Sequence, residues 1–127
     1  MIMSVALASG AMLLMPVLKS ATGSSLTAEG AVQLINREKA VVIDVCEATE
    51  FAAAHVGGAK NIPLSQLEEK LTGMVKNKTI PLILVCQSGA RSGRAVAIAK
   101  KLGYEQAQSL GGGLAAWKTA NLPIEKA

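Results

Sequence analysis

A cysteine set between an apolar run and a helical pattern is the feature of this sequence with the clearest chemical meaning. Cys86 follows Leu82–Val85, which predicts a buried strand, and it precedes residues 91–102, whose apolar positions fall on one helical face. Open α/β sheets bind ligands at loops of this kind, outside the carboxyl ends of their strands. The loop amides, the helix N-terminus and Arg91 would all favour the thiolate of Cys86, which is its nucleophilic form. The sequence therefore predicts that Cys86 is catalytic.

The six residues after Cys86 are the candidate substrate-binding groups. They are Gln87, Ser88, Gly89, Ala90, Arg91 and Ser92. No side chain between the cysteine and the arginine is a general base, so the loop suits stabilisation of a sulfur anion better than removal of a proton. A lone cysteine after a strand is often just a small buried apolar residue. A glycine and an arginine at these offsets, ahead of a well-patterned helix, favour the catalytic role instead.

Composition bounds the chain to one small domain and excludes several kinds of function. Half of the 127 residues are apolar, which is enough for a single modest core. The net charge of +4 comes from scattered Lys and Arg, and with only three aromatic residues we expect no nucleic-acid partner. Two cysteines and one histidine cannot complete a four-ligand zinc site unless carboxylates or a second chain contribute, so no metal and no cofactor are expected. A small anionic substrate suits the mildly basic charge, and the soluble domain is expected to be a monomer.

Alternating strands and helices are predicted to position the Cys86 loop. Strands are expected at 41–45, around 61–62, at 82–85 and at 107–110. Helices are expected after Thr27 as an N-cap, at 47–54, at 65–71, at 91–102 and at 114–120. This alternation predicts an α/β fold, with a parallel sheet covered by helices on both faces.

Residues 1–18 carry no charged side chain, and fourteen of them are aliphatic or Met. As a helix the segment would be about 27 Å long, just short of the hydrocarbon thickness of a bilayer. We therefore expect an apolar N-terminal helix that anchors the chain in a membrane, a linker at 19–25 and a domain at 26–127. The alternatives are a cleaved signal peptide and a buried soluble helix. A signal peptide would normally have basic residues before the apolar run. Lys19 favours a cytoplasmic catalytic domain, with a periplasmic one as the alternative.

Three motifs make residues 26–124 resemble the rhodanese family, in a single-domain, membrane-tethered bacterial form. Residues 44–51 with 55–63 are similar to its second signature, the Cys86 loop is similar to its active-site loop, and 111–117 resemble its closing glycine turn and Trp helix. The resemblance implies a five-stranded parallel sheet. It also implies a sulfurtransferase, in which Cys86 takes a sulfane sulfur from a donor such as thiosulfate and passes it to a thiol or protein acceptor. The amides of residues 87–92 would cradle the persulfide, and Arg91 would steady the loop or the donor's charge.

Two other functions remain open beside turnover of a small donor. The first is a non-turnover persulfide carrier or docking module that serves a partner protein through Cys86. The second is a phosphatase, because related phosphatases share this fold. Four residues separate Cys86 from Arg91, whereas those phosphatases have five, and the shorter loop fits a sulfur better than a phosphoryl group.

Cys46 departs from the family pattern, which usually has an arginine at that position. The resemblance implies that Glu50 would be that arginine's partner, and that Asp44, His55 and Asn61 are scaffold rather than substrate contacts. Cys46 and Cys86 follow neighbouring strands of the predicted sheet, so a bridge between them is sterically conceivable. We expect Cys46 to be a packed structural thiol, with a resolving role towards a Cys86 persulfide as the alternative.

Overall fold

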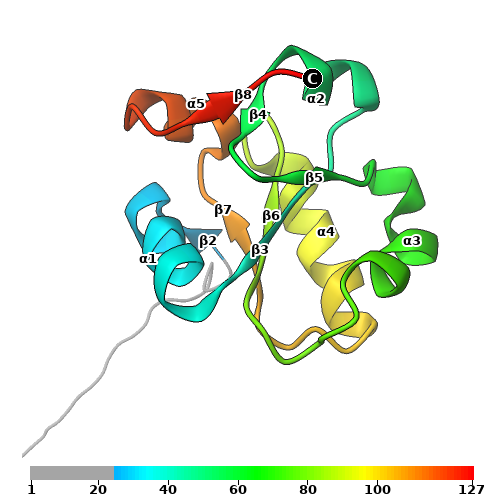
Figure 1. Cartoon of the computed structure of the whole chain (residues 1–127). Helices are drawn as coiled ribbons and strands as arrows, with labels where there is room; N and C mark the ends of the chain where they lie inside the picture. Colours follow the sequence, from blue (N-terminus) through cyan, green and yellow to red (C-terminus); the bar gives the residue numbers. More distant parts are fainter. Residues whose placement is uncertain (1–24) are drawn as a thin grey trace, which may run out of the picture.

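Five parallel strands form the central sheet of the protein, which a computed structural model describes over residues 25–127 (Figure 1). The strand order is β2-β7-β6-β3-β5, and every neighbouring pair is parallel. The bounds are Ser25–Leu26 for β2, Ala107–Leu110 for β7, Leu82–Val85 for β6, Val41–Asp44 for β3 and Lys60–Asn61 for β5. The predicted five-stranded parallel sheet is confirmed.

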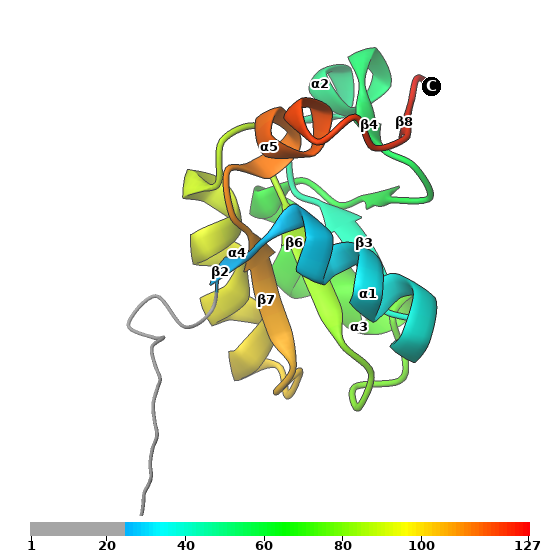
Figure 2. The same cartoon turned by 90° about the vertical axis from the view of Figure 1, so that its left-hand side faces the viewer.

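Helices cover both faces of this sheet, as predicted. On one face lie α3 (Leu67–Met74) and α4 (Ala90–Lys101), and on the other lie α1 (Ala28–Glu38) and α5 (Gly113–Thr119). Figure 2 shows α4 and α1 on opposite sides of β7. The Cys86 loop is therefore held between packed elements, with α4 on one face of the sheet and α5 on the other.

The side chains of β6 alternate between the two hydrophobic cores. Leu82 and Leu84 pack with α3 and α4, whereas Ile83 and Val85 pack with α1 and α5. All four are almost completely buried. A parallel strand covered on both faces has no solvent side, which explains why this segment is apolar without interruption. The residue that follows it, Cys86, thus stands at the end of the strand in the middle of the sheet.

Most of the predicted helices are confirmed to within one residue at each end. Thr27 caps α1, since its hydroxyl accepts a hydrogen bond from the Gly30 amide at 2.9 Å. The short helix α2 (Ala48–Ala53) begins at a capping box, in which the Glu47 amide donates to the Glu50 carboxylate at 2.9 Å. The helix predicted at 65–71 begins as a 3₁₀ turn at Leu64–Gln66 and continues as α3.

Three strands of two residues each were not predicted. Ser25, which the sequence places in a linker, belongs to β2 and pairs with Ser109 of β7. The strands β4 (His55–Val56) and β8 (Ile124–Glu125) form a separate antiparallel pair, and the C-terminal end of the chain lies beside α2 (Figure 1). Two residues are too few for a periodic pattern, so only tertiary pairing defines these strands.

The expected apolar N-terminal helix at 1–18 and all of the expected linker except Ser25 lie outside the described residues. Membrane anchoring by residues 1–18 therefore stays a prediction. From residue 25 onwards, none of the helices has both the length and the apolar character needed to cross a bilayer.

Candidate active site

Cys86 lies at the carboxyl end of β6, enclosed by the loop that leads into α4. Cys86 is only 2% exposed. The Gly89 amide donates a hydrogen bond to the sulfur at 2.9 Å, and the Ser92 amide approaches it at 3.4 Å. Gly89 has φ +113, a backbone conformation that side chains disfavour, and this lets the chain curl back over the sulfur before the helix begins. The loop is thus a cradle of amides around one sulfur atom.

Hydrogen bonds to the sulfur outweigh its burial and hold the pKa of Cys86 below its ordinary value. Burial alone would raise the pKa, because it removes water from the charged form. The Ser92 hydroxyl and the amides of Ser92, Gly89 and Ser88 lower it by stabilising the thiolate. The predicted activation of Cys86 therefore comes from the loop that encloses it.

A buried pair of hydroxyl groups stands behind the sulfur. The Ser92 Oγ lies 3.6 Å from Cys86 Sγ and 2.7 Å from the Oγ of Ser109 on β7. Ser92 is also within reach of the Gly89 carbonyl, at 3.1 Å. If Ser109 donates to Ser92, the Ser92 proton is free to be donated to the thiolate. Ser109 was not among the predicted site residues, because it lies 17 positions from Ser92 and no local pattern links them.

The start of α5 holds the backbone of the Cys86 loop from the other side. The Leu114 amide donates to the Cys86 carbonyl at 2.8 Å, and the Ala115 amide donates to the Gln87 carbonyl at 3.2 Å. Because these two carbonyls are turned towards α5, the following amides can face the sulfur. Gly113 makes the contact possible, since it has φ +58 and a Cβ at this position would overlap the Cys86 carbonyl oxygen. The glycine turn and the Cys86 loop are thus one structural unit.

Arg91, the only cation of the loop, is paired with Glu50 of α2. Its Nη1 and Nη2 donate to the two carboxylate oxygens at 2.8 and 3.0 Å, which is the bidentate geometry of a strong charged hydrogen bond. The pair lowers the pKa of Glu50 to about 2 and raises the pKa of Arg91. The sequence predicted Arg91 as a loop or donor contact but did not predict this partner.

Cys46 is a free thiol whose surroundings differ from those of Cys86. It is 1% exposed, and the Gln87 side-chain amide approaches its sulfur at 3.8 Å. Burial, reinforced by the nearby Asp44 carboxyl group, raises the pKa of Cys46 to about 12. A thiol that keeps its proton at neutral pH is a poor nucleophile. These features support the expected structural role over the resolving one.

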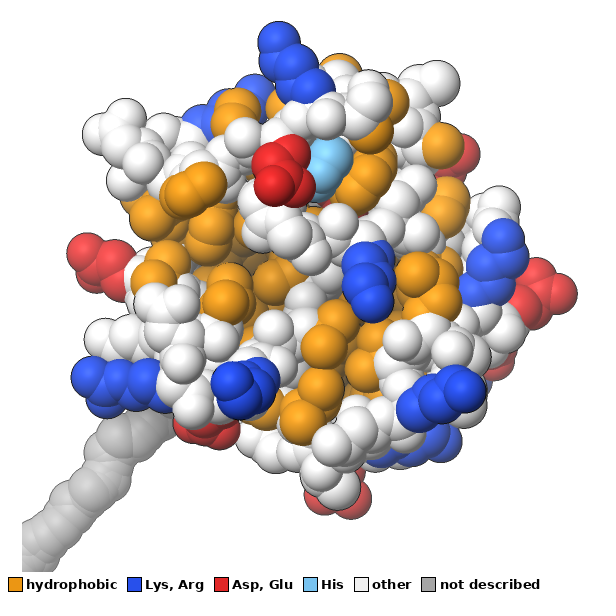
Figure 3. Space-filling view, viewed as in Figure 1, with side chains coloured by type: hydrophobic (Ala, Val, Ile, Leu, Met, Phe, Trp, Pro, Cys, Tyr) orange, Lys and Arg blue, Asp and Glu red, His pale blue; other side chains and the backbone are white. Residues whose placement is uncertain are grey.

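Three further residues that the family resemblance placed in the scaffold contact neighbouring elements, and two of them, Asp44 and Asn61, hold the backbone at the end of β3. The Asp44 carboxylate accepts from the Cys46 amide at 2.8 Å, and the Asn61 amide group donates to the carbonyls of Asp44 and Cys46 at 3.0 and 2.9 Å. The His55 ring contacts the Phe51 carbonyl at 2.7 Å and the Glu125 carboxylate at 3.5 Å. Figure 3 shows this imidazole, in pale blue, beside a carboxylate in red. None of these contacts reaches the Cys86 sulfur.

The predicted site residues therefore take different positions around the sulfur. Ser88, Gly89 and Ser92 direct amides at it, and Arg91 faces Glu50. Gln87 directs its side chain at Cys46, and Ala90 is the first residue of α4. In residues 25–127, no three His, Cys, Asp or Glu side chains are grouped so that they could hold a metal ion.

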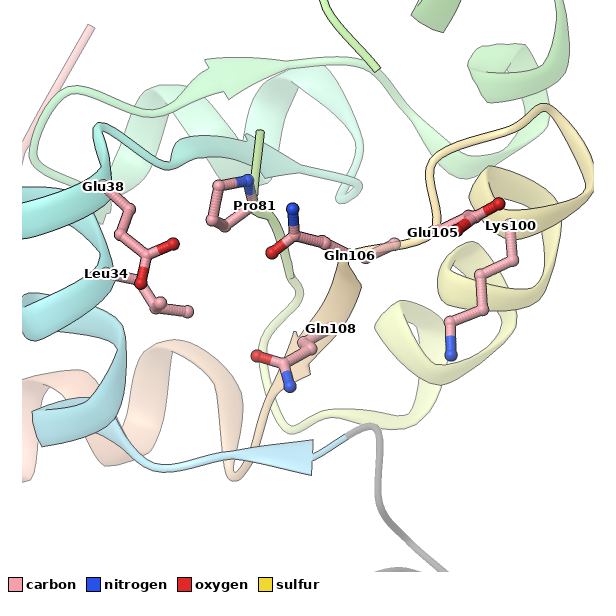
Figure 4. A pocket seen from close by; sticks show the side chains of 8 residues that line it. Leu34, Glu38, Pro81, Lys100, Glu105, Gln106 and Gln108 are labelled. Carbon is pink, nitrogen blue, oxygen red and sulfur yellow. The ribbon is translucent and has the colours of Figure 1, made fainter. Parts of the chain in front are cut away.

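A hollow of about 310 Å³ lies away from this site (Figure 4). Its lining includes Leu34 of α1, Gln108 of β7 and Pro81, which directly precedes β6. Cys86 directly follows the same strand, so the hollow and the sulfur lie at opposite ends of β6. The hollow has no part in the chemistry of Cys86.

Comparisons with known proteins support the fold. The profile of the rhodanese-like domain matches residues 27–120. The chain belongs to the rhodanese-like family. This confirms the family that the sequence motifs indicated, and it assigns the strand, loop and helix around Cys86 to a rhodanese-like domain.

Several rhodanese-like proteins and structures are similar to this chain. The uncharacterized protein YqhL of Bacillus subtilis is 43% identical over 79 residues, which are 62% of this chain and 61% of that protein. The thiosulfate sulfurtransferase GlpE of Pseudomonas putida is 33% identical over 99 residues, covering 78% of this chain and 87% of that one. A crystal structure of a thiosulfate sulfurtransferase from Pseudomonas aeruginosa matches with a TM-score of 0.74 and 28% identity, over 81% of this chain and 20% of that chain. The chain thus spans about three fifths of the first of these relatives.

Proposed function

We propose that this protein is a sulfurtransferase that carries a sulfane sulfur as a persulfide on Cys86. The observation that supports it most directly is the set of donors around the sulfur, with the Gly89 amide at 2.9 Å and the Ser92 amide at 3.4 Å. Such a set stabilises a sulfur anion both before and after sulfur is taken up. Relatives named thiosulfate sulfurtransferases, one of them covered over 87% of its length, support the same activity.

The proposed reaction has two steps. In the first, the Cys86 thiolate attacks the outer sulfur of thiosulfate, a bond forms between the two sulfurs, and sulfite leaves with the electron pair of the broken S–S bond. In the second, a thiophilic acceptor such as cyanide or a thiolate attacks the terminal sulfur, and Cys86 leaves as the thiolate. Neither step needs a general base, in agreement with a loop that contains none.

The test of this proposal is intact mass spectrometry after incubation with thiosulfate. We expect the wild-type chain to gain the mass of one sulfur and to lose it on addition of cyanide, and Cys86→Ser to gain nothing. Steady-state turnover of thiosulfate and cyanide should follow ping-pong kinetics. An unchanged mass in the wild-type chain would overturn the proposal. Hydrolysis of an aryl phosphate that depends on Cys86 would instead support the phosphatase hypothesis.

A persulfide carrier that serves a partner protein is the second candidate function. It needs the same donors around the Cys86 sulfur as the enzyme does, and the 2% exposure of Cys86 leaves little of that sulfur open to solvent. A carrier would take up one sulfur in the mass experiment and yet show little turnover with thiosulfate and cyanide. Stoichiometric uptake with a turnover number near zero would therefore select the carrier over the enzyme.

Anchoring to a membrane through residues 1–18, with the catalytic domain on the cytoplasmic side, is part of the same proposal. It is supported by the uncharged apolar run at the start of the sequence and by Lys19 directly after it. The full-length chain should sediment with membranes, and a chain that starts at residue 24 should stay in the supernatant with equal transfer activity. Full-length chain that stays in the supernatant without detergent would contradict the anchor.

A further inference from the structure

The ion pair between Arg91 and Glu50 changes the charge that the site presents to a donor. Arg91 is the only charged residue among the six that follow Cys86. Both of its terminal nitrogens donate to the Glu50 carboxylate, which sets one negative charge against this one positive charge. With Cys86 as the thiolate, these three groups sum to one net negative charge. The loop therefore offers no uncompensated cation to an anionic donor.

Glu50 is held in this position by more than the pair itself. Its Oε1 accepts from the Glu47 amide at 2.9 Å and from Arg91 at 2.8 Å, so the first turn of α2 fixes the carboxylate. The side chains of Arg91 and Glu50 are 31% and 34% exposed, so the pair can be approached from solvent, and Arg91 lies close enough to Cys86 for their charges to interact. Asp44 is almost completely buried and lies close enough to Glu50 for the two carboxyl groups to interact electrostatically. The Glu50 carboxylate therefore repels an anionic donor, and this repulsion is proportional to the donor's charge.

We propose that Glu50 is a specificity-determining residue that makes the site select singly charged sulfur donors, such as organic thiosulfonates and persulfides, over dianionic thiosulfate. The inference rests on the proposed function, because it needs transfer of sulfur to Cys86. Thiosulfate remains a donor, but its kcat/KM is lowered by its second negative charge. The Cys86 thiolate, Arg91 and Glu50 together would repel a singly charged donor with about half of the energy with which they repel thiosulfate.

The chemistry of the two donor classes is otherwise the same. With methanethiosulfonate, the Cys86 thiolate attacks the terminal sulfur, the S–S bond breaks, and methanesulfinate leaves with the electron pair. With thiosulfate the leaving group is sulfite. Methanethiosulfonate differs from thiosulfate by one methyl group in place of one charged oxygen, so it is a matched probe for donor charge.

The deciding experiment compares kcat/KM for these two donors, with cyanide as acceptor, in the wild-type chain and in Glu50→Gln. The glutamine keeps an oxygen that can accept from the Glu47 amide but removes the negative charge. We expect kcat/KM to rise about threefold for methanethiosulfonate and about tenfold for thiosulfate, because the interaction scales with the donor's charge. The ratio of the two values should thus shift about threefold towards thiosulfate, and added salt should shrink that shift.

Glu105→Gln is the matched control, since Glu105 is exposed and lines the hollow at the other end of the sheet. It should leave the donor ratio unchanged. The ratio does not depend on the fraction of folded enzyme, so a poorly folded variant still reports, and Glu50→Ala should shift it in the same direction. An unchanged ratio in both Glu50 variants, or a shift towards methanethiosulfonate, would overturn the role of Glu50. Failure of the wild-type chain to take sulfur from either donor would instead overturn the proposed function.

Discussion

Two buried cysteines lie just beyond the ends of neighbouring parallel strands, and their pKa values are shifted in opposite directions. Cys46 follows β3 and Cys86 follows β6, and the two strands pair in register up to Asp44 and Val85. Burial raises the pKa of Cys46 to about 12, whereas the hydrogen bonds of the loop hold the pKa of Cys86 below its ordinary value. The depth of burial is the same, so burial does not decide reactivity. The donors aimed at the Cys86 sulfur and the Asp44 carboxyl group beside Cys46 do.

Removal of each sulfur in turn should show the largest contrast between the two sites. Cys86→Ser should abolish sulfur transfer, because the oxygen that replaces the sulfur cannot form a persulfide. Cys46→Ser should keep the transfer rate within about twofold of wild type, since the Cys46 thiol contacts only the Gln87 side chain near the loop. Thiosulfate–cyanide turnover measures both. Loss of activity in Cys46→Ser, together with an internal disulfide in non-reducing peptide maps, would give Cys46 the resolving role.

Gly113→Ala should weaken the Cys86 site by moving its loop. A Cβ there overlaps the Cys86 carbonyl, and a left-handed alanine costs about 1–2 kcal/mol in addition. We expect transfer to fall at least tenfold and the melting temperature to fall by several degrees. Gly93→Ala is the matched control, because a Cβ at Gly93 in α4 meets no atom within 4 Å. It should raise the stability by up to about 1 kcal/mol and leave transfer unchanged.

Ser92→Ala should make Cys86 more like Cys46 by removing the hydroxyl donor. The pKa of Cys86 is lowered in the native loop, so its thiolate is lost as pH falls through that pKa. Without the Ser92 hydroxyl the pKa of Cys86 rises. The midpoint of the curve of alkylation rate against pH therefore shifts to higher pH. Alkylation by iodoacetamide near pH 7 should slow about tenfold, with no difference at high pH. Ser88→Ala, at an exposed side chain of the same loop, should leave the profile unchanged.

Ser109 should have the smallest effect of the four, because it acts on the thiolate only through Ser92. Ser109→Val removes the hydroxyl and should shift the Cys86 alkylation profile in the same direction as Ser92→Ala, with a rate loss of about threefold near pH 7. Ser109→Thr keeps the hydroxyl at a similar volume and should restore the profile. Equal profiles for the two variants would show that Ser109 fills space and does not orient Ser92.

The sequence predicts those parts of this molecule that depend on local patterns. Each correctly placed feature is a single continuous stretch of sequence. These features are the apolar run of β6, the cap at Thr27 and the loop from Cys86 to Ser92. Ser109, by contrast, meets Ser92 only because α4 packs against β7. No residue type or spacing identifies such a contact in advance.

The partner of Arg91 shows a second reason why the prediction was incomplete. The cation was identified from the loop, but its effect depends on Glu50, 41 positions away. The family resemblance assigned Glu50 to an arginine at position 46, and this chain has a cysteine there. Only the three-dimensional arrangement shows that the carboxylate pairs with Arg91 instead.

The link between α5 and the Cys86 loop also provides reporters of how often the loop opens. The amide hydrogens of Leu114 and Ala115 are bound to the carbonyls of Cys86 and Gln87, so they exchange with solvent water only when the loop and the helix separate. Their exchange rates therefore measure how often the cradle opens. Neither residue carries sulfur or charge, so isotope exchange at these two backbone positions reports the opening of the loop without any label on Cys86 itself.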